Sequence, residues 1–227
     1  MGNTSNEKYN VVLEQLAQIC RDGKLPVLGF DHDVKRFQGK YYASAEHYGK
    51  PTRPEEMGRY NDLSGKTGVC YFAENSLTAL AESYGRMYHR ANGDFAISGQ
   101  MLDIAQMYTL HPKLPLVLVD MATLASMLHL TADQLTGVDY SLTQAITGYL
   151  ANYPGRNFHG IYYASRHYFT GMCLAVFEPE EGELFETLAS EPLSKYTEHQ
   201  SLPVGWPYKD ITAEEMLVKI LRIDVTL

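Results

Sequence analysis

The chain has 227 residues, of which 45% are hydrophobic and 20% charged, and its formal net charge is -8. This composition is typical of a globular protein with enough apolar residues to bury a core, so we expect one folded unit. The acidic balance argues against general nucleic-acid binding, which needs a basic surface. No apolar run approaches membrane-spanning length, and the N-terminus lacks the charged-then-apolar order of a signal peptide. We therefore expect a cytoplasmic protein that makes no membrane contact.

The cysteines and histidines do not predict a metal site or a disulfide framework. Cys20, Cys70 and Cys173 are widely separated, and the last two lie in apolar runs that favour small core residues. No HExxH pattern is present among the eight histidines, so we expect them to be exposed or hydrogen-bonded and expect no bound metal.

The first half of the chain alternates between polar loops and short periodic segments. Apolar residues at helical spacing predict an opening helix over 10–20, and residues 29–54 read as a loop with short strands. Residues 69–73 form an apolar, β-branched and aromatic run that predicts a buried strand. A helix follows, capped by Asn75 or Ser76, with Gly85 as a possible terminator.

The second half predicts more strands and helices in mixed order. Residues 114–120 predict a central strand, and 121–130 and 140–150 predict helices with a cap at 131–134 between them. Strands are expected at 160–164 and 172–177, as likely neighbours in the sheet. The acidic run after Pro179 is typical of a solvated face, and residues 216–223 predict a closing strand. This order favours the α+β class.

The sequence Gly65-Lys66-Thr67 superficially matches the end of a phosphate-binding P-loop. The first glycine of that motif would have to be residue 60, which is a tyrosine. We therefore expect a turn before the strand and no nucleoside triphosphatase.

Glu82 is the only carboxylate between Glu74 and Asp94, and it falls beside the face that its helix should bury. A buried carboxylate is costly unless it is paired, so this residue needs a partner or a chemical role. The alternative is a surface pair with Arg86, one turn further along the helix.

Two arginines in polar loops strengthen the functional interpretation of Glu82. Arg36 and Arg59 lie near tyrosines, and guanidinium groups bind phosphate oxygens through two parallel hydrogen bonds. Together with one carboxylate, this set suits a ligand that carries both phosphates and an aromatic ring.

Four short segments in this order resemble the RES-domain family of bacterial toxins. They are Arg36-Phe37, Gly58-Arg59-Tyr60-Asn61, the run from Val69 to Glu82, and the run from Gly160 to Arg166. The resemblance implies a fold like that of ADP-ribosyltransferase toxins, with a mixed β-sheet core and flanking helices. It also implies that the chain consumes NAD as a substrate, with no resident cofactor.

The same resemblance implies a role for each matched residue. Arg36 and Arg59 would hold the NAD pyrophosphate, and Glu82 would stabilise the positive charge that develops as nicotinamide leaves. Ser165 would hydrogen-bond the nicotinamide ribose or amide. The remaining pocket residues implied by the family are Tyr60, Asn61 and Tyr71. For Tyr71, a place in the core beside Phe72 is an equally good interpretation.

Three classes of function remain open at this point. The first is NAD cleavage with water or phosphate as acceptor, the second is ADP-ribosylation of a protein, and the third is a catalytically silent binding domain. The complete residue set speaks against the third. We expect a helical extension at 1–28 before a catalytic domain at 29–227, and an antitoxin or immunity protein as partner. The sequence does not reveal the oligomeric state, and it leaves open whether the chain acts in the cytoplasm where it is made or is delivered into a target cell as an effector.

Overall fold

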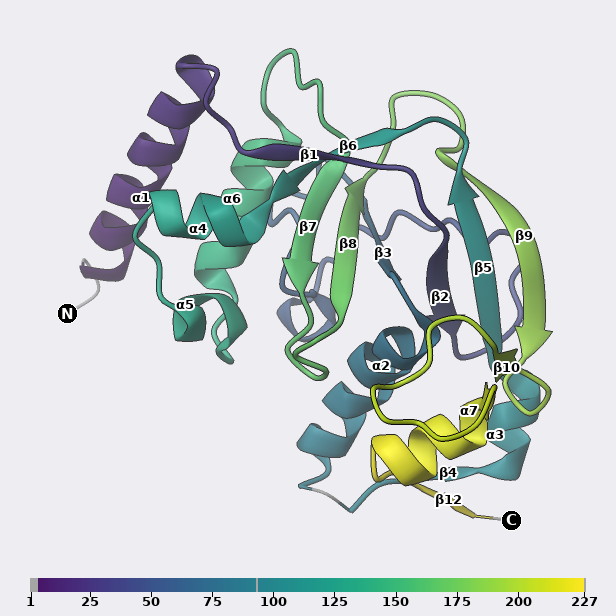
Figure 1. Ribbon diagram of the computed structural model, residues 1–227. Coiled ribbons are helices and arrows are strands. Elements are labelled where there is room, and N and C mark those ends of the chain that lie inside the picture. Colours follow the sequence, from purple (N-terminus) through teal and green to yellow (C-terminus); the bar gives the residue numbers. More distant parts are fainter. Residues whose placement is uncertain (1–3, 93, 227) are drawn as a thin grey trace.

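The computed structural model describes residues 4–92 and 94–226, which form a curled mixed sheet with flanking helices (Figure 1). Across the described residues the sheet has eight strands. In spatial order they are β1 (Val27–Phe30), β6 (Leu116–Asp120), β7 (Gly160–Ala164), β8 (Met172–Phe177), β3 (Val69–Ala73), β2 (Val34–Gln38), β5 (Gln106–Pro112) and β9 (Phe185–Pro192). Strands β6 and β7 are parallel, and the other pairs are antiparallel. The predicted α+β class with a mixed sheet core is confirmed.

Helices and two small sheets complete the described part of the chain. The helical elements are α1 (Thr4–Arg21), η1 (Pro54–Glu56), α2 (Ser76–Arg90), α3 (Gly99–Ile104), α4 (Met121–Met127), α5 (Ala132–Thr136), α6 (Ser141–Ala151), α7 (Ala213–Glu215) and the π-helix η2 (Met216–Ile220). The small sheets pair β10 (Thr197–Glu198) with β11 (Ile211–Thr212) and β4 (Ala96–Ser98) with β12 (Asp224–Thr226). Of the helices in the described ranges, none is long and apolar enough to cross a membrane.

Apolar side chains fill both faces of the large sheet. On one face a large cluster joins the strands to the helices, with Leu80 of α2 and Ile146 of α6 fully buried in it. On the other face a smaller cluster gathers Cys70, Phe72 and Leu174. Because strand residues alternate between the faces, Cys70 and Phe72 point away from Tyr71, their neighbour in β3.

In the middle of the large sheet, two neighbouring strands are joined by a single residue pair. Strands β2 and β3 pair only at Lys35 and Ala73, whereas β2 pairs with β5 over its whole length. At the other end of β3, Val69 exchanges backbone hydrogen bonds with Gly49 instead (3.1 and 3.2 Å). The edge of β3 between these two contacts is left open, and the cleft described below lies there.

Several elements agree with the sequence prediction at their bounds. The strands at 69–73, 160–164 and 172–177 are confirmed, and β7 and β8 are neighbours. The opening helix is confirmed and is longer than predicted, and Asn75 is the N-cap of α2. All three cysteines are free, and Cys70 and Cys173 are buried.

Two predicted chain features are wrong. Gly85 does not end α2, which continues to Arg90. The closing segment is not a strand over 216–223, because Thr212 and Glu215 form a capping box that starts α7 and leads into η2. Met216 and Leu217 of η2 are fully buried, so a helical turn covers the core there.

The sheet also differs from the prediction in two strands. Residues 114–120 contribute β6, which is not central but lies next to the edge strand β1. The run is apolar because side chains pack against both faces of β6, and not because the strand is central in the sheet. The acidic segment after Pro179 was predicted only as a solvated face, yet it leads into the edge strand β9. Only Phe185 is buried in β9, so the sequence has no alternating apolar pattern from which this strand could be predicted.

A buried carboxylate ties the C-terminal region to α2. Glu198 is 4% exposed and accepts hydrogen bonds from the hydroxyls of Ser76 and Tyr196 (both 2.9 Å). It also accepts from the backbone N–H groups of 199, 200 and 201, and Lys35 lies 3.9 Å away. Burial acts to raise the pKa of Glu198, but the backbone N–H groups, Tyr196 and Lys35 together lower it below its ordinary value.

We expect Glu198→Ala to lower the free energy of unfolding by about 3 kcal/mol, because it removes a charged acceptor and leaves buried donors unpaired. The wild-type contribution is present above the carboxyl pKa of the unfolded chain and is lost as the pH falls through the lowered folded pKa. Urea unfolding at pH 7 and at pH 3 measures both effects, with the exposed Glu181→Ala as control. Equal stability of the two variants at pH 7 would contradict the prediction.

Candidate functional site

A cleft of about 940 Å³ opens where β2 and β3 separate. Its walls come from β2, β3, η1, α2 and the turn after β7. Four arginines line it, together with Lys35 and Lys50. The arginines are Arg36, Arg59, Arg86 and Arg166. The cleft is therefore a cationic region in a chain whose net charge is -8.

Helix α2 places Glu82 at the bottom of this cleft. The Asn75 side chain caps the helix by accepting hydrogen bonds from the Thr78 backbone and hydroxyl (both 2.8 Å). Leu80 and Ala81 then point into the core and fix the rotation of the helix. Glu82 follows at the border of this buried face, half-buried and lining the cleft.

Two glycines let the turn after β7 lie directly against α2. A methyl group added at Gly85 of α2 would lie 2.8 Å from Nδ1 of His167. One added at Gly171, at the end of the turn, would lie 2.1 Å from the Thr78 hydroxyl. Larger residues at either position would therefore force the turn and the helix apart, and this approach explains why Gly85 occurs inside a helix.

The turn clamps the carboxylate of Glu82. Its Oε1 accepts hydrogen bonds from the Ser165 hydroxyl (2.6 Å) and from the Arg166 backbone N–H (3.0 Å). The Ser165 oxygen in turn accepts from the backbone N–H groups of His167 and Tyr168. Glu82 is therefore held in one orientation by a residue that is 1% exposed. Arg86 is not its partner in the described residues, because Arg86 donates to the Glu55 carbonyl (2.9 Å).

Arg59 is a buried cation that lacks a complete set of partners. It is 7% exposed, and its Nε has no hydrogen-bond partner among the described residues. The guanidinium lies 5.6 Å from the ring centre of Tyr60 and 5.5 Å from that of Tyr163. Burial acts to lower the pKa of Arg59, but the two tyrosines and Glu82 raise it on balance. An anion in the cleft would satisfy this charge.

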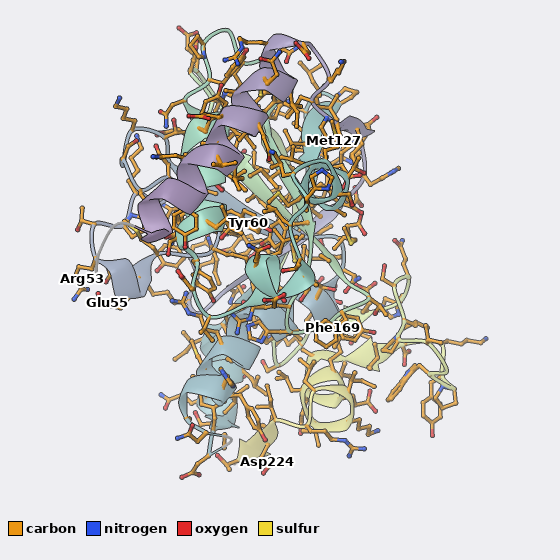
Figure 2. All side chains as sticks on the ribbon, turned by 90° about the vertical axis from the view of Figure 1, so that its left-hand side faces the viewer. Arg53, Glu55, Tyr60, Met127, Phe169 and Asp224 are labelled. Carbon is orange, nitrogen blue, oxygen red and sulfur yellow. The ribbon has the colours of Figure 1, made fainter. Side chains whose placement is uncertain are left out.

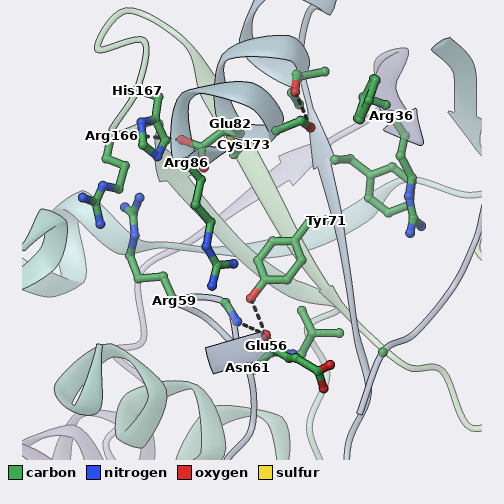
Figure 3. Close-up of a pocket in the computed structure, with 18 of the residues that line it drawn as sticks. Arg36, Glu56, Arg59, Asn61, Tyr71, Glu82, Arg86, Arg166, His167 and Cys173 are labelled. Atoms are coloured by element: carbon green, nitrogen blue, oxygen red, sulfur yellow. Dashed lines mark hydrogen bonds between the residues drawn. The ribbon is translucent and has the colours of Figure 1, made fainter. Parts of the chain in front are cut away.

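Arg36 differs from Arg59, the other arginine predicted to bind phosphate, because its guanidinium has hydrogen-bond partners within the protein. It lines the cleft, yet its Nη1 donates to the Ala45 carbonyl (2.6 Å) and to Sγ of Cys70. Its guanidinium also lies 5.6 Å from the Phe72 ring centre. Figure 3 shows Arg36 and Tyr71 on opposite sides of β3. Part of the Arg36 guanidinium is thus already used by the protein.

The loop before β3 is fixed by Tyr71. Its hydroxyl accepts from the Tyr60 backbone N–H and donates to the Asn61 side chain (both 3.1 Å). Asn61 accepts from the Gly58 N–H as well (2.6 Å), so the turn that carries Arg59 is closed on itself (Figure 3). Tyr71 and Asn61 line the cleft, whereas the Tyr60 ring is buried against Tyr163 with ring centres 4.3 Å apart.

The structure adds cleft residues to which the sequence assigned no part in ligand binding. Arg86 lies one turn after Glu82 on α2, and Figure 3 shows its guanidinium on the same side of β3 as that of Arg59. Tyr140, Tyr163 and His167 also line the cleft. Helical spacing from Glu82 could have identified Arg86, and adjacency to Ser165 could have identified His167.

The rim of the cleft is marked by η1. Figure 2 shows Glu55 of this helix and the preceding Arg53 at the outer edge of the molecule. Glu56 also lines the cleft, and it pairs with Arg53. These rim carboxylates are exposed, in contrast to Glu82. Among the described carboxylates of the cleft, Glu82 is therefore the one that is half-buried and held by the turn after β7.

Comparisons with known proteins agree with this architecture. The family model described as RES domain matches residues 33–201. No curated protein sequence matches the chain. A chain in the crystal structure of the M. tuberculosis MbcT–MbcA toxin–antitoxin complex has a similar fold, with a TM-score of 0.58 and 18% identity. The similarity covers 81% of this chain and 92% of that chain.

We expect Ser165→Ala to destabilise the protein by about 2 kcal/mol, because two backbone N–H groups and the Glu82 carboxylate each lose a hydrogen bond in a buried turn. Thermal unfolding measures the change. Ser126→Ala is the matched control, since the exposed Ser126 hydroxyl donates only to the Ala122 carbonyl of its own helix. Equal melting temperatures for the two variants would show that the turn does not depend on Ser165.

Proposed function

Because the chain belongs to the RES domain family, we propose that it cleaves NAD at the nicotinamide–ribose bond and acts as the toxin of a toxin–antitoxin pair. One observation carries the proposal. A buried arginine with an unpartnered Nε shares a cleft with a carboxylate that the protein holds in a fixed orientation. The first group suits an anionic substrate, and the second suits a reaction that develops positive charge.

The size and charge of the cleft support a dinucleotide. Its volume of about 940 Å³ lies within the usual range for small-molecule sites. Arg59 and Arg86 can bind the two phosphates, and Arg36 can contribute the part of its guanidinium that the protein does not use. The Tyr71 ring lines the same cleft, is drawn next to Arg86 in Figure 3, and offers a surface for the nicotinamide or its ribose.

Glu82 supplies the chemical step in this proposal. When the bond between nicotinamide and ribose breaks, the ribose ring acquires oxocarbenium character, and a fixed anion nearby stabilises it. Ser165 and the Arg166 backbone hold one carboxylate oxygen. They position Glu82, so that no reorganisation is needed when the charge develops. Ser165 is buried behind Glu82 and is absent from the cleft lining, which favours positioning over substrate contact.

The acceptor of the ADP-ribosyl group distinguishes two versions of the proposal. Water or phosphate as acceptor makes the chain an NAD glycohydrolase or phosphorylase, and a protein acceptor makes it an ADP-ribosyltransferase. The first version is our main proposal, because the cleft holds four arginines next to Glu82 and its charge suits a small anionic acceptor such as phosphate. A cognate antitoxin is proposed by analogy with the toxin–antitoxin complex whose fold this chain shares.

We expect Glu82→Gln to lower the rate of NAD cleavage roughly 100- to 1,000-fold while the protein stays folded, because the amide keeps the shape and loses the charge. Purified protein is incubated with NAD, and the melting temperature is measured on the same preparation. Glu56→Gln is the matched control, since Glu56 lines the same cleft at its exposed rim. A stable and fully active Glu82→Gln protein would remove Glu82 from the mechanism.

The same assay identifies the acceptor and tests the toxin role. Products are analysed with and without phosphate and with cell lysate: free ADP-ribose or its phosphate supports the main proposal, and labelled protein supports the transferase. Expression of the wild type should deplete cellular NAD and arrest growth, whereas Glu82→Gln should do neither. Unchanged NAD in cells that make folded wild-type protein would refute the proposal.

We expect Arg59→Lys to raise KM for NAD roughly 10- to 100-fold with the fold intact, because lysine keeps the charge but loses one of two parallel charge-assisted hydrogen bonds. Steady-state kinetics measure the effect. Arg53→Lys serves as control, since the exposed Arg53 pairs with Glu56 at the rim. A wild-type KM in the Arg59 variant would show that Arg59 does not bind the phosphates.

A further inference from the structure

His167 lines the cleft but has no role in the function proposed above. It lies in the turn that clamps Glu82, and its side chain lines the catalytic cleft. The same side chain also lines a second hollow of about 340 Å³ on the far side of α2. The exposed residues Tyr88 and His89 lie in the wall of that hollow, so it communicates with solvent. His167, together with its neighbour Arg166, therefore lies between the cleft and a solvent-connected space.

The position of the imidazole is fixed from two directions. The backbone N–H of His167 donates to the Ser165 hydroxyl oxygen (3.2 Å), and that hydroxyl donates to Glu82. Its ring packs so closely on α2 that only glycine fits at residue 85. The turn that orients the carboxylate thus also orients the imidazole, and Figure 3 shows the two side chains close together.

Burial and neighbouring cations favour the neutral form of the His167 ring. Glu82 and His89 face it from α2, Arg166 from its own turn, and Arg59 from the loop before β3. Burial lowers the pKa of His167, Glu82 raises it, and Arg166, Arg59 and His89 lower it further, so the pKa lies below its ordinary value. A neutral imidazole has one ring nitrogen with a free lone pair, which can accept a proton.

We propose that His167 is the general base that deprotonates the water molecule attacking C1′ of the nicotinamide ribose. This inference rests on the proposed function. The water proton moves to the imidazole, the oxygen forms a bond to C1′, and the C1′–N bond breaks. The bonding electron pair returns to the nicotinamide ring, which leaves as a neutral molecule. The imidazolium then releases its proton to water in the second hollow.

The other carboxylates of the cleft are less suited to this role. Glu82 already accepts two hydrogen bonds on one oxygen and is needed as an anion facing the ribose. Glu56 lies at the exposed rim and pairs with Arg53. Glu82 next to His167 also favours the imidazolium that forms when the proton is taken, which makes the pair chemically complementary.

The test compares two acceptors in one variant. Hydrolysis by His167→Gln should fall roughly 100-fold or more, the usual contribution of a general base, and should lose the acidic limb of the pH profile. Cleavage by dianionic phosphate, which attacks through an oxygen that is already deprotonated and needs no general base, should change by less than about threefold. Tyr88→Phe, in the second hollow but outside the cleft, should match the wild type in both reactions.

A second variant guards against misfolding of the first. His167→Ala removes the imidazole without placing new atoms between the turn and α2, and it too should reduce hydrolysis more than cleavage by phosphate. Equal loss in both reactions, in either variant, would make His167 a positioning residue and overturn the proposal. Wild-type protein that cleaves NAD only with phosphate would overturn it too, while leaving the proposed function intact. Wild-type protein that cleaves no NAD under any condition would refute the proposed function itself.

Discussion

The separation of β2 from β3 is the constraint on which the site depends. The two halves of the sheet meet at one residue pair, Lys35 and Ala73, and Gly49 pairs with the far end of β3. A fully paired β3 would bury the surface that Tyr71 and Arg59 now present to the cleft. The interruption costs ladder hydrogen bonds, and buried clusters on both faces of the sheet supply the stability that offsets this loss.

The second requirement is the close contact between α2 and the turn after β7. Gly85 and Gly171 remove the side chains that would keep these elements apart, and the contact brings Ser165 to Glu82. A carboxylate at the edge of a helix would otherwise rotate freely in solvent. Here one hydroxyl and one backbone N–H fix it, so the orientation of the reactive group is built into the packing of the backbone.

Local sequence patterns predicted much of the fold but little of the geometry of the site. The strands at 69–73, 160–164 and 172–177 could be located because glycines and turns border apolar runs. The edge strand β9 could not, because most of its side chains are exposed and carry no alternation. The capping box at Thr212 can be recognised in the sequence, but the apolar run after it also fits a strand, and the structure has a helical turn there. Glu82 and Ser165 are 83 positions apart, so no spacing rule could join them, and their roles came from the family resemblance.

Arg59 is a buried cation whose Nε has no hydrogen-bond partner among the described residues. Burying a guanidinium with an unpaired Nε is unfavourable, and the rings of Tyr60 and Tyr163 compensate only in part through their π faces. Because Asn61 and Tyr71 close the loop that carries Arg59, the side chain has no easy route to solvent. An anion that enters the cleft would offset part of the free energy lost by holding this cation in place. The excess of acidic residues lies outside the cleft, so the attraction for anions is local to the cleft rather than a property of the whole surface.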